Sequence, residues 1–277
     1  MLTRIDFIRM DSEGNSLDES VRVNYARQTG PNPYILTRVE GLGPVKTAIS
    51  TAQKATYNGE TFLSARSGGR NIVLDVELNP NYSSETVASL RSDLYRVLSP
   101  GEHVIVALFF SGPSTPLYTN GWVESVEPDI FSQIPTLRIS LISIEPYFTR
   151  GTITESVNDP SQPLTIPYSE TIPTGFEVSF RITGATPYVN IAKAGSYPPM
   201  RINDLQTGDR LTLNTSRGFR ALTLTRGGVT GDALAKLQNK LNWHQLDRDD
   251  INRFTFTVGS ENVTSLVYKY SPLVAGV

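Results

Sequence analysis

The 277-residue sequence contains no cysteine and only two histidines. The absence of cysteine excludes disulfide bonds, cysteine-ligated zinc and thiol nucleophiles, and it leaves the redox compartment of the protein undetermined. His103 and His244 lie far apart in the sequence, so neither has a second histidine at metal-ligand spacing. We expect both to be structural, because a catalytic base needs a nucleophile or carboxylate partner that orients it.

Long hydrophobic runs and an excess of one charge are also missing. The longest apolar run, residues 104–110, is far shorter than the roughly 18 residues that a membrane-spanning helix needs. The N-terminus carries Asp6, Arg9 and Asp11 among its apolar residues, which is not the pattern of a signal peptide. The formal net charge is −2, so we expect no general affinity for nucleic acid or for an anionic membrane. We expect a soluble protein that starts in the cytoplasm if a bacterium makes it.

Motifs of common enzyme classes are absent as well. The sequence has no Gly-x-Ser-x-Gly nucleophile elbow and no phosphate-binding Gly-Lys-Ser/Thr loop. Gly41 and Gly43 have the spacing of a dinucleotide-binding motif, but Pro44 follows them and no helix is expected there. We therefore expect no enzyme activity, no catalytic residue, no metal and no cofactor, and the binding residues stay unassigned.

Two remaining groups of residues invite a functional interpretation. Asp247, Asp249 and Asp250 lack the further oxygen ligands and the glycine-containing loop of a calcium site, so we expect a solvated turn. Trp122 and Trp243 are candidates for sugar-stacking platforms, but packing in a core or an interface explains both better. Glycosylation sequons begin at Asn81, Asn214 and Asn262. Without a signal peptide, we attribute these sequons to chance.

The most regular pattern lies between residues 69 and 148. Apolar residues at every second position predict a half-buried strand over residues 71–78. After a break at Asn79-Pro80-Asn81, Ser83 or Ser84 is expected to cap a helix at about residues 84–98. Its apolar stripe comprises Val87, Leu90, Leu94, Val97 and Leu98. Residues 104–110 do not alternate, which predicts a strand buried on both faces, one of them under the helix. Residues 117–126 and 137–144 are expected to form an antiparallel pair.

The segment before this pattern is weakly hydrophobic. Strands are expected over residues 2–8 and 34–39, with a turn at residues 11–15. Residues 45–62 are rich in Thr, Ala and Ser and contain Asn58-Gly59, a strong hairpin signal. Because this stretch is poor core material, we expect an exposed loop or a hairpin that gains its partner only on assembly.

A composition shift marks the second half of the chain. Residues 151–175 contain four prolines and no helical pattern, so we expect two domains, residues 1–150 and 151–277. Short alternating strands are expected at residues 176–182, 188–192, 201–203, 210–214, 221–225, 253–258 and 265–270. This spacing favours a β-sandwich or a jelly roll. Residues 232–241 are expected to form a short helix, with Leu234, Leu237 and Leu241 on one face. The whole chain is thus expected to be mainly β, with a sandwich or barrel-like first domain that carries one α-helix.

Many short motifs, in order and along nearly the whole chain, carry a resemblance to a known family. In the first half they include Val39-Glu40-Gly41-Leu42-Gly43-Pro44, Gly69-Arg70-Asn71-Ile72 and Pro146-Tyr147-Phe148. In the second half they include Thr174-Gly175-Phe176-Glu177-Val178, the Gly208-Asp209 turn before Leu211 and Leu213, Trp243-x-x-Leu246, and Val267-Tyr268-Lys269-Tyr270. Together these motifs resemble the distal tail proteins (Dit) of siphophages, the phages with long, non-contractile tails.

The resemblance implies a structural virion protein of the phage tail tip with a role in host attachment. It implies a ring, six-fold in the family, with the tail tube protein on one face and the baseplate hub or tail fibre on the other. The first domains would form the ring around the DNA channel, with DNA only as passing cargo, and galectin-like C-terminal sandwiches would lie outside. We also expect residues 45–62 to cross to the adjacent subunit. The alternative function is a carbohydrate-binding module of a virion or cell-surface protein.

Overall fold

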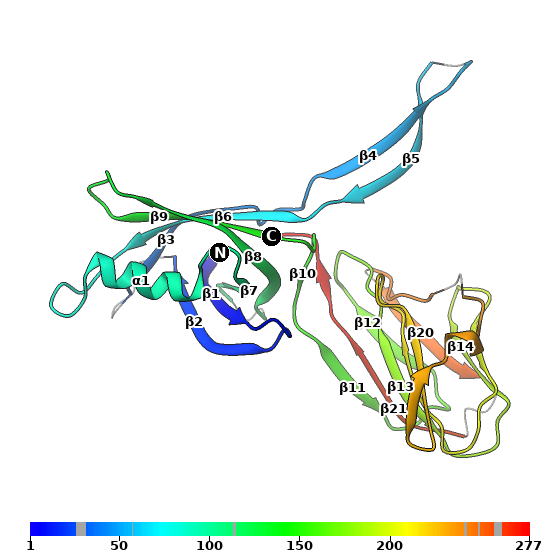
Figure 1. Cartoon of the computed structure of the whole chain (residues 1–277). Coiled ribbons are helices and arrows are strands. Elements are labelled where there is room, and N and C mark those ends of the chain that lie inside the picture. Colours follow the sequence, from blue (N-terminus) through cyan, green and yellow to red (C-terminus); the bar gives the residue numbers. More distant parts are fainter. Residues whose placement is uncertain (26–31, 57, 113–114, 241–242, 249, 258–261) are drawn as a thin grey trace. The chain divides into compact units, whose positions relative to one another are not determined.

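The chain forms two compact units in the computed structural model, which describes residues 1–25, 32–56, 58–112, 115–240, 243–248, 250–257 and 262–277. The first unit comprises Met1–Arg150 together with Ala275–Val277, and the second comprises Gly151–Val274 (Figure 1). The described residues are mainly in β-strands and include one α-helix. This confirms the mainly-β fold that the sequence predicts.

The first unit is built around a closed sheet. Its strands are β1 (Leu2–Met10), β2 (Ser16–Asn24), β3 (Tyr34–Glu40), β4 (Thr47–Gln53), β5 (Glu60–Ser67), β6 (Arg70–Leu78), β7 (His103–Phe110), β8 (Leu117–Asp129), β9 (Thr136–Ser143) and β10 (Phe148–Thr149). Seven of them lie in the order β8-β7-β1-β2-β3-β6-β9, and pairing of β8 with β9 closes the sheet into a barrel. The pairs are antiparallel except β2 with β3. Closure leaves these seven strands without a free edge between them.

The alternating pattern of β6 is confirmed and supplies much of the barrel core. Ile72, Leu74, Val76 and Leu78 are buried, and they face the interior beside the buried Leu137, Ile139 and Leu141 of β9. Strand β2 is not among the sequence expectations, because its first half is polar and only Val21 and Val23 alternate inward. The expectation that residues 104–110 are buried on both faces is wrong. Ile105, Phe109 and Phe110 of β7 are only partly buried, since the helix packs against β1, β2 and β6 instead.

The helix α1 (Val87–Val97) starts later than the sequence suggests. Thr86 caps it: the Thr86 hydroxyl accepts a hydrogen bond from the Ser89 amide, and the Ser89 hydroxyl accepts one from the Thr86 amide. Ser83 and Ser84 are not the cap, because they belong to a separate turn whose amides bond to Asn81. Leu90, Leu94 and Val97 are buried, as the helical spacing predicts.

The second unit is a sandwich of two sheets. The strands of the sandwich are β11 (Ile153–Val157), β12 (Leu164–Tyr168), β13 (Glu177–Ile182), β14 (Tyr188–Lys193), β15 (Met200–Asn203), β16 (Arg210–Asn214), β17 (Ala221–Arg226), β18 (Val229–Asp232), β19 (Leu237–Gln238), β20 (Asp250–Thr257) and β21 (Val263–Tyr270). The residues of the second unit also include the short strand β22 (Leu273–Val274), which lies in neither sheet of the sandwich. One sheet has the order β11-β21-β13-β16-β17-β18, and the other has β12-β20-β14-β15-β19. Strands β11 and β12 lie in the proline-containing stretch, where the sequence predicts no strand.

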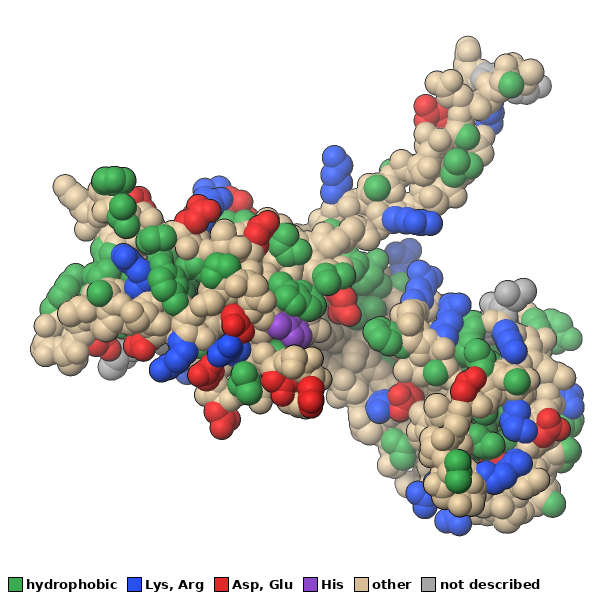
Figure 2. Space-filling view, viewed as in Figure 1, with side chains coloured by type: hydrophobic (Ala, Val, Ile, Leu, Met, Phe, Trp, Pro, Cys, Tyr) green, Lys and Arg blue, Asp and Glu red, His purple; other side chains and the backbone are tan. Residues whose placement is uncertain are grey.

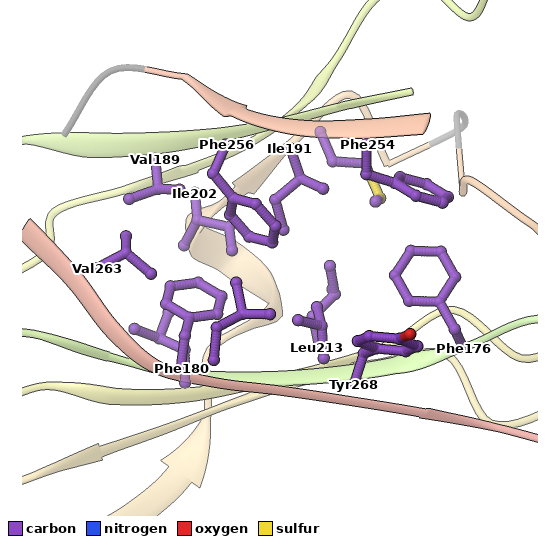
Figure 3. Packing of buried hydrophobic residues seen from close by; sticks show 14 of the residues in the cluster. Phe176, Phe180, Val189, Ile191, Ile202, Leu213, Phe254, Phe256, Val263 and Tyr268 are labelled. Atoms are coloured by element: carbon purple, nitrogen blue, oxygen red, sulfur yellow. The ribbon is translucent and has the colours of Figure 1, made fainter. Parts of the chain in front are cut away.

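Aromatic side chains from the two sheets fill the space between them (Figure 3). Phe176 and Phe254 meet edge to face with ring centroids 4.8 Å apart, and Phe180 meets Phe256 in the same way at 5.9 Å. The short helix expected over residues 232–241 is reduced to the single 3₁₀ turn η1 (Leu234–Lys236). The next residue, Leu237, belongs to strand β19 and pairs with Ile202 of β15, so the backbone is extended there. Leu241 lies outside the described residues.

Candidate interaction surface

His103 lies on the outside of the barrel next to Trp122. The two residues are cross-strand neighbours on β7 and β8, and their rings stack with centroids 4.5 Å apart and an interplanar angle of 8°. The His103 Nε2 has no hydrogen-bond partner among the described residues. No carboxylate of the described part of the chain therefore orients this imidazole through Nε2, and Trp122 has one face covered.

His244 and Trp243 belong to the second unit. His244 is buried with Nε2 3.2 Å from the Ile191 carbonyl oxygen, and its burial lowers the pKa of the imidazole. A neutral imidazole can donate that hydrogen bond through Nε2–H. Trp243 packs against the sandwich core, with the Arg220 guanidinium 5.5 Å from its ring centre. Both residues fit a packing role.

The acidic group after His244 is described only in part. The Asp247 carboxylate accepts a hydrogen bond from the ammonium of Lys193, which also donates to the Gln245 carbonyl oxygen at 2.6 Å. Asp249 and the side chain of Asp250 lie outside the described residues. Within the described part of the chain, no three His, Cys, Asp or Glu side chains lie together as metal ligands would. No helix in the same residues has the length and apolar character to cross a membrane.

The sandwich carries a polar cavity of about 460 Å³ beside β14 and β15. Its wall includes Tyr188, Arg201, Asn203 and Lys236. The Arg201 guanidinium lies 3.5 Å from the centre of the Tyr188 ring and donates a hydrogen bond to Asn203. Because the guanidinium covers that face of the ring, the face is closed to a stacked sugar.

The most unusual polar residue of the first unit is Arg70, at the start of β6. Its side chain is 3% exposed, and its burial lowers the pKa to about 10. One terminal nitrogen donates to the Gly41 carbonyl oxygen at 2.9 Å, and the other donates to those of Pro146 and Ala275 at 2.5 and 2.8 Å. Arg70 therefore connects three parts of the first unit: the segment between β3 and β4, the segment after β9, and the last residues.

The close approach of the backbone to β6 explains the glycine at position 41. Gly41 has φ +82°, and a Cβ built there would lie 1.8 Å from the Asn71 carbonyl oxygen. Val277 donates its amide hydrogen to Leu42, so the segment is also covered by the end of the chain. These contacts are tight backbone packing, and they leave no space for a dinucleotide.

Strands β4 and β5 form a hairpin (the β4–β5 hairpin) that extends from the barrel (Figure 1). This confirms the hairpin expected around Asn58-Gly59; Tyr57 lies outside the described residues. All residues of β4 are exposed, and so are most of those of β5. The exposed side chains include Ile49, Phe62 and Leu63, at 66%, 63% and 60%. Such apolar exposure is typical of a surface that binds another protein.

The register of the hairpin places two of these side chains on one face. Ile49 pairs with Ala65 and Thr51 pairs with Phe62, while Leu63 is the additional residue of a bulge between these pairs. Since Ile49 and Thr51 are two positions apart, Ile49 and Phe62 lie on the same face. The hairpin therefore presents an apolar face on a pair of strands whose outer edges remain available.

Similar proteins are found among solved structures, which match this chain along nearly its whole length at low sequence identity. No protein-family model matches, and no curated protein matches. The crystal structure of the Dit protein of phage SPP1, described as a paradigm of the hub adsorption apparatus in phages infecting Gram-positive bacteria, is 10% identical. The match covers 97% of this chain and 98% of that one, with a TM-score of 0.65. A chain of the phage P2 baseplate in its activated conformation with calcium is also 10% identical, with 99% of each chain covered and a TM-score of 0.47. The chain thus has the fold of the SPP1 protein, which confirms the Dit-like fold expected from the sequence.

Proposed function

We propose that this protein is a structural component of a phage tail tip, located in the virion and made in the host cytoplasm. Six copies form a ring that joins the tail tube to the baseplate hub or tail fibre and encloses the DNA channel. The observation that carries the proposal is the shared fold with the SPP1 hub protein along 97% of the chain. A role in assembly also agrees with the described residues, whose histidines serve packing and stacking.

The β4–β5 hairpin supports assembly through the first unit. Arg70 and Gly41 fix its base, so the exposed Ile49 and Phe62 are held in place without a cover in the monomer. Covering a fixed apolar face costs little conformational entropy, because the hairpin is already ordered. In the proposed ring, the hairpin crosses to the adjacent copy and covers this face there.

The two units have different proposed roles. The first unit, residues 1–150 in the sequence-based division, forms the ring and faces the tail tube protein. The second, residues 151–277 in the same division, is the sandwich on the outside of the ring. A formal net charge of −2 suits a conduit for DNA, since a strongly basic chain would retain DNA through its phosphates.

The proposal is tested by the mass of the assembled protein. Native mass spectrometry and negative-stain microscopy of the concentrated protein are expected to give rings near six times the chain mass of 30.5 kDa. Replacing Ile49, Phe62 and Leu63 by serine is expected to remove the rings. The matched control replaces Phe219 and Val229, exposed apolar residues of the second unit, by serine and is expected to keep them.

Two outcomes would contradict the proposal. A monomer at every concentration would reject the ring, and intact rings after deletion of residues 47–58 would reject the role of the hairpin. The alternative function, carbohydrate binding, predicts a monomer retained on a glycan surface by the second unit. The covered Tyr188 ring argues against that outcome for the polar cavity.

A further inference from the structure

A second exposed apolar group lies on the first unit, at the turn between β8 and β9. Ile130, Phe131 and Ile134 form this group (the apolar tip), and Phe131 is 93% exposed. The Asp129 carboxylate accepts hydrogen bonds from the amides of Phe131 and Ser132, so the turn is held in one shape. Figure 2 shows hydrophobic side chains at this end of the unit. An ordered turn that presents a nearly bare phenyl ring is suited to insertion into another protein.

The strands next to the apolar tip present acidic side chains on their outer face. Asp75, Arg138 and Glu127 are neighbours across β6, β9 and β8, and Glu77, Thr136 and Asp129 form the next row toward the tip. These two rows (the acidic face) hold four carboxylates and one guanidinium. They border a groove of about 450 Å³, whose lining includes Asp75, Glu127 and Arg138. The face has a formal net charge of −3.

The β4–β5 hairpin carries the opposite charge. Between residues 45 and 68 the chain has Lys46, Lys54 and Arg66 against Glu60, a formal net charge of +2. The hairpin thus combines cationic and apolar side chains, while the apolar tip and the acidic face combine apolar and anionic ones. Opposite charges guide association and disfavour the pairing of like surfaces.

The hairpin and the apolar tip also lie at opposite ends of β6 (Figure 1). The hairpin leads through Gly68 and Gly69 into Arg70 at the start of the strand, whereas Glu77, near its end, pairs with Thr136 beside the tip. At about 3.3 Å per residue, these ends are roughly 25 Å apart. A head-to-tail ring needs two complementary surfaces on different sides of each subunit. This arrangement supplies them.

We propose that the apolar tip and the acidic face receive the β4–β5 hairpin of a second copy of this chain. The inference rests on the proposed ring and names the surface on which the hairpin docks. Ile49 and Phe62 cover the apolar tip, and the lysines of the hairpin face the carboxylates around Glu127. Each copy gives one hairpin and receives one, so the contact repeats until the ring closes.

Disulfide cross-linking tests this contact directly. Because the chain has no cysteine, the variant with Thr51→Cys and Ser132→Cys contains only the two introduced thiols. A bond within one copy is excluded, since disulfides need Cα atoms within about 7 Å and these positions lie at opposite ends of β6. Oxidation is expected to give a ladder of covalent species up to the full ring. The control pair, Thr51→Cys with Glu13→Cys in the β1–β2 turn, is expected to give none.

A second variant separates the contact from the folding of the chain. Phe131→Ser is expected to weaken association at least tenfold while leaving the far-ultraviolet spectrum and melting temperature unchanged. Tyr197→Ser, at a residue 90% exposed in the second unit, is the matched control and is expected to associate normally.

The outcomes distinguish this inference from the proposed function. Rings that form but give no ladder with the Thr51 and Ser132 pair, or that resist Phe131→Ser, overturn the docking surface and leave the ring in place. A protein that stays monomeric at all concentrations overturns both.

Discussion

The guanidinium carbon of Arg70 lies 3.8 Å from the centre of the Phe148 ring, in a site where both side chains are buried. The hydrogen-bond acceptors of this guanidinium are main-chain carbonyl oxygens, including those of Gly41 and Pro146. A planar fork of five N–H donors serves several carbonyls at once, which a lysine ammonium cannot reproduce. The pair therefore fixes the base of the β4–β5 hairpin.

Arg70→Lys is expected to destabilise the first unit by about 3 kcal/mol, because buried carbonyls lose their donors while a charge stays buried. The chain has one tryptophan in each unit, so urea unfolding of a Trp243→Phe background reports on the first unit through Trp122. Arg22→Lys is the control, since Arg22 is largely exposed and bonds to Asp6. Equal losses in the two variants would show that the fork geometry is unimportant.

Gly41→Ala is expected to cost more than 3 kcal/mol, because a Cβ would overlap the Asn71 carbonyl and the residue has a positive φ. Gly14→Ala separates the two causes. Gly14 has nearly the same φ, +84°, but open space around its Cα, so only about 1 kcal/mol is expected. Thermal melts of both variants measure the difference, and similar melting temperatures would contradict the close approach.

Thr86→Ala is expected to destabilise the first unit by about 1 kcal/mol, because it removes the capping box of α1. Ser84→Ala tests the cap that the sequence suggested and is expected to change stability by less than about 0.5 kcal/mol. Chemical denaturation of the two variants compares them directly. A larger effect at Ser84 would place the start of the helix earlier than Thr86.

The second unit is expected to lose stability below about pH 6.5. Burial lowers the pKa of His244 in the folded state, so the unfolded chain binds the proton more readily. Stability is therefore complete above the ordinary pKa of 6.5 and falls as the pH drops toward the folded-state value, by up to about 1.4 kcal/mol per pH unit. His244→Gln is expected to flatten this dependence, measured by Trp243 fluorescence in a Trp122→Phe background.

The pH experiment includes its own comparison. His103 stacks on Trp122 in the other unit, so His103→Gln is expected to leave the pH profile of the second unit unchanged. A profile that stays steep in His244→Gln would contradict the assignment of the pH dependence to His244.

Local patterns made parts of the fold predictable. The alternation of β6 and the apolar stripe of α1 follow from periods of two and 3.6 residues, which neighbouring residues alone determine. The N-cap residue of α1 was harder to predict, because Ser83, Ser84 and Thr86 all carry hydroxyls. Only the reciprocal hydrogen bonds between Thr86 and Ser89 distinguish the true cap. The pairing of β8 with β9 was expected, but its closure of a barrel depends on strands far apart in the sequence.

Of the candidate interaction surface, only the β4–β5 hairpin was predictable from the amino-acid composition. A Thr-, Ala- and Ser-rich segment with Asn58-Gly59 predicts an exposed hairpin. The buried role of Arg70 has no local signal, because an arginine after Gly68-Gly69 is ordinarily a surface residue and its acceptors come from distant backbone. The apolar tip was also missed, since Ile130 and Phe131 in a sequence are more often core residues than bare ones.

The position of Ala275–Val277 in the first unit has a consequence for how such chains recombine. In the sequence, the second unit is an insertion in the first: the chain enters it after Arg150 and leaves it before Ala275. A stop codon after Arg150 would remove the second unit. It would also remove the Ala275 carbonyl oxygen, to which Arg70 donates a hydrogen bond. Replacing the second unit by that of a related chain therefore requires two crossovers, because a single crossover inside it would also exchange the last segment, Ala275–Val277.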